Sequence, residues 1–114
     1  MAFYESIFIL KSSVSEEEVS VVQDKMKETL EKHGGSIIKA ENWGKKKLAY
    51  EIAHDRRGTY TFFQFEASGN VVSELERLYR LEDSILKFLT VRVDEEALQV
   101  QEVEETVESN SGGV

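Results

Sequence analysis

Cysteine is absent from the 114-residue chain, which excludes disulfides, thiolate nucleophiles and cysteine-ligated metal centres. This absence is typical of a reducing compartment, and we expect a cytoplasmic protein. Long apolar runs are also absent, because the longest, residues 7–10, is far too short to cross a bilayer. No basic stretch precedes an apolar run at the beginning of the chain, so we expect no targeting segment and no membrane partner.

Motifs for catalysis are equally scarce. The only two histidines are His33, at the end of a predicted helix, and His54, in a predicted turn, and neither is placed to act as a general base. The sequence has no HExxH zinc motif, no P-loop and no paired-glycine nucleotide fingerprint. Gly34 and Gly35 are interpreted as a helix stop instead. We therefore predict no catalytic residue, no metal, no cofactor and no small-molecule substrate.

The charge is unevenly distributed along the chain. A net charge of −8 argues at first against nucleic acid, since phosphate binding depends on lysine and arginine. However, seven of the 22 acids lie from Asp94 onward, where there is no lysine or arginine, and residues 1–93 hold 15 acids against 14 bases. With 40% hydrophobic residues overall, we predict a near-neutral globular domain at 1–93 and a flexible acidic tail at 94–114.

Two helices are predicted from apolar periodicity. The first begins at Ser15, which forms a capping-box pattern with Glu18. Its apolar residues recur at spacings of three and four and form one stripe for packing on a sheet: Val19, Val22, Met26 and Leu30. The second begins at residues 68–70 and has a packed face that includes Leu75 and Tyr79.

Strands are predicted at residues 3–10, 37–52, 59–67 and 85–93. The long second strand is interrupted at Trp43 and Gly44, where glycine permits a bulge, and a turn at 54–58 joins it to the third. The order strand, helix, strand, strand, helix, strand predicts an α+β fold. We expect a ferredoxin-like βαββαβ sandwich with a four-stranded antiparallel sheet, two helices on one face and the other face open.

This topology is shared by acyl-phosphate hydrolases and by RNA-recognition domains, and neither matches well. The hydrolases require a phosphate-binding loop with an arginine after the first strand, where this chain has residues 11–15, KSSVS. The RNA-recognition motif would place its base-stacking rings at Thr59, Thr61 and Gln64, so the aromatic pattern is out of phase. The rings of the third strand therefore fit a core or a protein interface better than a base platform.

Three consecutive lysines, Lys45, Lys46 and Lys47, lie on the predicted second strand, so their side chains alternate between its faces. One interpretation is a solvated edge strand on which lysines prevent aggregation, and the alternative is that the lysines contact phosphates. The residues alone leave both interpretations open.

Several segments, in their order and spacing over residues 3–93, resemble the bacterial small-subunit ribosomal protein six family. The most specific is WGKKKLAYEI at residues 43–52. The others are Tyr4-Glu5, Gly34-Gly35, Gly58-Thr59-Tyr60 and the segment LEDSILK at residues 81–87.

The resemblance implies a ferredoxin-like fold without enzymatic activity. It also implies binding to the central domain of small-subunit ribosomal RNA together with ribosomal protein eighteen. On this basis we expect phosphate contacts from Lys45, Lys46, Lys47, Lys87 and Arg92. We expect Trp43 and Tyr60 to contact the partner protein. The rival hypothesis is a stand-alone ferredoxin-like module with a regulatory or ligand-binding role.

Overall fold

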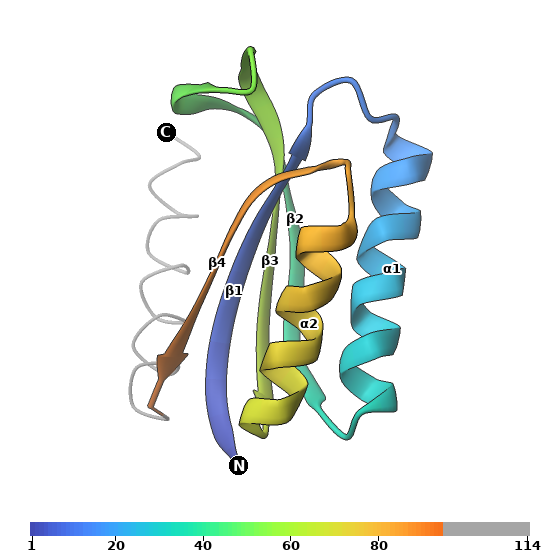
Figure 1. Cartoon of the computed structure of the whole chain (residues 1–114), viewed down its shortest axis with the longest axis vertical. Helices are drawn as coiled ribbons and strands as arrows, with labels where there is room; N and C mark the ends of the chain where they lie inside the picture. The colour runs from blue at the N-terminus through green and yellow to red at the C-terminus, as the bar shows by residue number, and fades with distance from the viewer. Residues whose placement is uncertain (95–114) are drawn as a thin grey trace, which may run out of the picture.

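The computed structural model describes residues 1–94, and these form one sheet covered by two helices (Figure 1). The strands are antiparallel and lie in the order β2-β3-β1-β4. Both helices pack on the same face, which confirms the predicted ferredoxin-like α+β sandwich. The elements are β1 (Ala2–Lys11), α1 (Glu16–Lys32), β2 (Ser36–Ile52), β3 (Asp55–Ala67), α2 (Gly69–Leu81) and β4 (Ile85–Val93).

Helix α1 begins and ends where the sequence predicts. Ser15 is the N-cap, and its hydroxyl accepts a hydrogen bond from the Glu18 backbone N–H at 3.2 Å. At the other end Gly34 adopts a positive φ of 93°, and the Gly35 N–H bonds to the Leu30 carbonyl at 2.7 Å. The predicted stripe is buried against the sheet: Val19, Val22, Met26 and Leu30.

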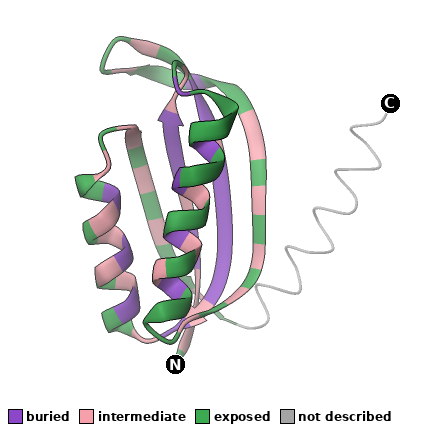
Figure 2. Cartoon of the chain, turned by 90° about the vertical axis from the view of Figure 1, so that its right-hand side faces the viewer, coloured by how far each residue is buried: buried purple, intermediate pink, exposed green. Residues whose placement is uncertain are grey.

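The core lies between the helices and the two central strands, as the burial colours of Figure 2 show. Phe8 of β1 packs edge-on against Phe63 of β3, with ring centroids 5.3 Å apart, and lies 5.0 Å from the ring of Tyr79 on α2. Because side chains alternate along a strand, the neighbours of Phe63, Phe62 and Gln64, point to the opposite, open face. The core therefore leaves one face of the sheet without a helical layer.

The predicted turn at residues 54–58 is wrong in its extent. Strand β2 ends at Ile52 and β3 begins at Asp55, so only Ala53 and His54 form the turn. Their φ values of 47° and 69° give the geometry of a two-residue type I′ hairpin turn. Alanine and histidine carry no strong signal for this conformation, and the turn was therefore placed too late. Arg56 and Arg57 consequently belong to a strand instead of a loop.

The expected domain boundary after residue 93 coincides with the end of β4, but residues 95–114, which make up nearly all of the expected tail, lie outside the described residues. Within residues 1–94, neither helix is long and apolar enough to cross a membrane.

Candidate nucleic-acid interface

The end of the β2–β3 hairpin, residues 45–57, carries a concentration of bases that we call the hairpin arm. The strand register places Lys45 opposite Thr59, Lys46 opposite Gly58, and Lys47 opposite Arg57. Two cations directly opposite each other on adjacent strands repel, so the last pair destabilises the isolated hairpin. An anionic ligand would relieve this repulsion.

A bulge and two glycines bend the arm toward the open face. The register shifts between Asn42 and Gly44, and Gly44 has a φ of 79° while its N–H bonds to the Asn42 side-chain oxygen at 2.8 Å. This confirms the interruption predicted at residues 43 and 44. Gly58 leaves room for Ile9, because a Cβ at residue 58 would lie 2.4 Å from the Ile9 Cγ2 atom. Leu48 is buried beside them, and Figure 1 shows the arm turned away from the helices.

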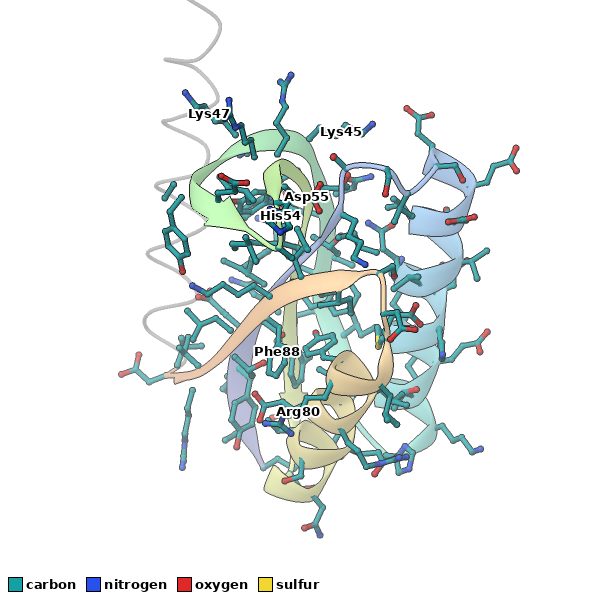
Figure 3. The ribbon with its side chains drawn as sticks, turned by 45° about the horizontal axis from the view of Figure 1, so that its top comes forward. Lys45, Lys47, His54, Asp55, Arg80 and Phe88 are labelled. Atoms are coloured by element: carbon teal, nitrogen blue, oxygen red, sulfur yellow. The ribbon has the colours of Figure 1, made fainter. Side chains whose placement is uncertain are left out.

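The three lysines of the arm point in different directions. Lys46 lies over the ring of Trp43, with its Nζ 5.1 Å from the ring centroid. Lys45 instead lines a pocket of about 290 Å³ with Glu16 and Val19 of α1. Figure 3 shows Lys45 and Lys47 diverging at the end of the arm. The run therefore spreads its charge around the arm and does not collect it on one flat surface.

Of the two predicted bases on β4, only Lys87 reaches the arm. Its Nζ donates a hydrogen bond to the Tyr50 hydroxyl at 2.5 Å. Arg92 pairs with Tyr4 toward the other end of the sheet and lines an open hollow with Met1 and Ala2. The structure thus separates Arg92 from the other predicted RNA contacts.

Arg56 and Arg57 were not predicted as site residues, although they lie on the same arm as the lysines. A useful signal was present, because two basic clusters, residues 45–47 and 56–57, lie close together within the predicted hairpin. Within residues 1–94, none of the arm's lysines or arginines, nor Lys87, has a carboxylate ion-pair partner. These cations therefore have no ion-pair partner in this part of the chain, and five bases against two acids, Glu51 and Asp55, leave the arm positively charged.

The two predicted partner contacts, Trp43 and Tyr60, lie on the open face. Trp43 stacks on Phe62 with an interplanar angle of 12° and a centroid separation of 5.0 Å, and its indole N–H donates to Glu41. Tyr60 is half-buried and pairs across strands with Ile9. Large apolar side chains are exposed on the same face, including Leu89 at 60% and Val91 at 42%. The open face thus combines aromatic rings with uncovered aliphatic area.

The two histidines lie apart from each other. His33 is the C-cap of α1, and its Nδ1 hydrogen-bonds to the Thr29 carbonyl oxygen at 2.9 Å. His54 lies at the tip of the arm, 3.8 Å from a carboxylate oxygen of Glu51. No group of three or more potential metal ligands occurs among residues 1–94.

Fold and surface together define a ferredoxin-like domain whose bases are concentrated on a hairpin arm at one end of its sheet. The family model of ribosomal protein S6 matches residues 3–92. The chain belongs to the ribosomal protein S6 family.

Individual relatives agree with this assignment. The small ribosomal subunit protein bS6 of Rickettsia rickettsii (strain Sheila Smith) is 39% identical over 94 residues, which cover 82% of this chain and 78% of that protein. The protein of the same name from Desulforapulum autotrophicum is 42% identical over 105 residues, covering 89% and 68%. The crystal structure of 30S ribosomal protein S6 from Thermotoga maritima is similar in fold, with a TM-score of 0.78, 32% identity, and coverage of 94% of this chain and 97% of that chain.

Proposed function

We propose that the chain is a non-enzymatic component of the bacterial small ribosomal subunit, in the cytoplasm, and that it binds ribosomal RNA. The binding site would be the central domain of the small-subunit RNA, occupied together with ribosomal protein eighteen. Family membership supports the ribosomal role. The single observation that carries RNA contact is the hairpin arm, on which bases from two strands lie without carboxylate partners in residues 1–94.

The arm is better suited to contacting phosphates than to contacting nucleobases. Its cations are spread around a narrow hairpin, which positions a phosphate backbone without reading sequence. Lys45, Lys46 and Lys47 act from the arm, and Lys87 acts from β4 beside it. Arg92, at the other end of the sheet, would make a separate contact.

The open face is the proposed surface for the partner protein. Trp43 and Tyr60 provide aromatic anchors there, and exposed Leu89 and Val91 extend the apolar area. Aromatic residues at the centre of an interface commonly contribute most of its binding energy. The arm and the open face adjoin, so one molecule can meet RNA and protein at the same time.

A titration of a central-domain ribosomal RNA fragment tests the proposal. The near-neutral domain reaches few phosphates, so we expect weak binding by the chain alone and affinity at least about tenfold higher when ribosomal protein eighteen is present. Raising the salt concentration should weaken RNA binding with and without the second protein. Equal affinity with and without the second protein would refute cooperative binding, and a stand-alone module would show no RNA binding in either case.

A further inference from the structure

Lys87 and Tyr50 make a contact between two elements that the sequence separates by 37 residues. The Lys87 Nζ lies 2.5 Å from the Tyr50 hydroxyl and 5.1 Å from the centroid of the Tyr50 ring. Lys87 is on β4, at one edge of the sheet, whereas Tyr50 is on the arm that extends from the other edge strand. The contact therefore joins the arm to β4 across the open face.

The arm needs such a contact to hold its position. The pairing of β2 with β3 is interrupted between Lys47 and Ile52, so no ladder pair fixes residues 48–51. Leu48, only 6% exposed, packs close to Gly58 beside Ile9 and provides an apolar contact. Tyr50 is 59% exposed and provides the polar one. Together they keep the arm curved over the end of the sheet.

The Lys87–Tyr50 contact differs chemically from an ion pair. Lys25 lies 3.4 Å from a carboxylate oxygen of Glu82, which offsets its charge. Lys87, in contrast, is held by a neutral hydroxyl, and no carboxylate within residues 1–94 pairs with it. A neutral partner fixes the position of the ammonium group without cancelling its charge. A preorganised cation of this kind loses less conformational entropy when it binds an anion.

We infer that Tyr50 is a positioning residue of the anion-binding surface, holding Lys87 beside the hairpin arm so that it binds one phosphate group of a nucleic-acid backbone. The inference rests on the proposed function and deepens it, because it assigns Tyr50 a role through Lys87 and not through direct contact with RNA. The hydroxyl carries this role, because the ammonium lies beyond it and not over the ring face.

A double-mutant cycle tests this inference in the complex with ribosomal protein eighteen and the RNA fragment. Lys87→Met should weaken binding and reduce the salt slope by about one unit, the effect of one lost phosphate contact. Tyr50→Leu should weaken binding about threefold to tenfold, the size expected for one charged hydrogen bond at an exposed site. In the Lys87→Met background, Tyr50→Leu should cause no further loss. Tyr50→Phe, which removes only the hydroxyl, should weaken binding as much as Tyr50→Leu.

Lys32→Met is a matched control, because Lys32 is an exposed lysine at the far end of α1. It should leave affinity unchanged. NMR of the free protein gives a readout independent of RNA: the Lys87 side-chain resonances should change in Tyr50→Phe, which removes the hydroxyl hydrogen bond, and should not change in Lys32→Met. Thermal unfolding of each variant shows whether the fold is retained.

The outcomes separate the inference from the proposed function. Equal losses from Tyr50→Leu in both backgrounds would overturn the inference, because Tyr50 would then act independently of Lys87. No loss from Lys87→Met, with a clear loss on removing Lys45, Lys46 and Lys47, would also overturn it while leaving RNA binding by the arm intact. No loss from any of these variants would refute the proposed function itself, and the inference with it.

Discussion

At the scale of single residues, the hydroxyl of Ser6 joins three elements inside the domain. It lies 2.8 Å from the Tyr79 hydroxyl on α2 and 2.8 Å from the Thr90 hydroxyl on β4. Ser6 is fully buried and Tyr79 is 1% exposed, so each hydroxyl depends on these partners. Burial raises the pKa of the Tyr79 phenol, which therefore stays neutral and able to donate. The network stabilises one particular packing of α2 on the sheet.

Tyr79→Phe should lower the free energy of unfolding by about 1–2 kcal/mol, because Ser6 loses a buried hydrogen-bond partner while the ring packing is retained. Urea unfolding measures this loss. Tyr4→Phe is the matched control, since Tyr4 stacks on Phe65 and its hydroxyl has no hydrogen bond in the described part of the chain. A Tyr79→Phe effect no larger than that of Tyr4→Phe would contradict the importance of the network. RNA affinity should be unchanged in both variants.

At the scale of elements, the shape of the arm depends on two glycines that serve different purposes. Gly44 provides the left-handed conformation at the bulge, and Gly58 allows β3 to approach the side chain of Ile9. Ile9 and the buried Leu48 both lie against Gly58 at the base of the arm. Local backbone freedom thus determines where the bases of the arm lie.

Gly58→Ala tests this dependence. The new Cβ would lie 2.4 Å from the Ile9 Cγ2 atom and 3.1 Å from the Leu10 carbonyl oxygen, so neighbouring atoms must move, at a cost of about 1–3 kcal/mol. We expect a lower unfolding midpoint and weaker RNA binding. Gly69→Ala is the control, because nothing lies within 4 Å of its added Cβ and alanine favours the helix that begins there. Equal midpoints for the two variants would refute the tight approach.

At the scale of the whole molecule, exposed apolar side chains and basic residues occupy adjoining surfaces. The helices cover one face of the sheet, the open face carries exposed apolar side chains, and the bases extend from one end on the arm. In the proposed function, one molecule would bind a phosphate backbone and a partner protein side by side, with Lys46 over Trp43 and Lys87 at the boundary. The concentration of bases on the arm also means that the net charge of the chain is a poor guide to where an anion binds.

Replacing Lys45, Lys46 and Lys47 together by alanine should leave the fold intact, since exposed lysines contribute little to stability. Affinity of the protein pair for RNA should fall, and the salt slope should become shallower by roughly one unit for each lost phosphate contact. Edge protection predicts a different result: an unchanged slope, with self-association of the free variant detected by sedimentation. That result would remove these lysines from the proposed RNA contacts.

Much of the fold follows from local sequence patterns. The Ser15 cap and the stripe through Leu30 are determined within a few residues, as is the interruption at Trp43 and Gly44, and all are confirmed. The turn at Ala53 and His54 is predicted too far along the chain, at residues 54–58, because alanine rarely adopts a positive φ and glycine at residue 58 is a common turn residue. That single error placed Arg56 and Arg57 in a loop, and so concealed the basic face of the second arm strand.

The sequence by itself determined the elements, their order and the family, because apolar periodicity, caps and a specific segment are properties of neighbouring residues. Only the tertiary structure decided which basic residues lie close together. The strand register places Arg57 opposite Lys47. The bend of the arm brings Tyr50 into contact with Lys87. Arg92 lies farther along β4, opposite Tyr4, and is therefore distant from the arm. These contacts join residues far apart in the chain, and they depend on sheet topology and backbone curvature that no local pattern encodes.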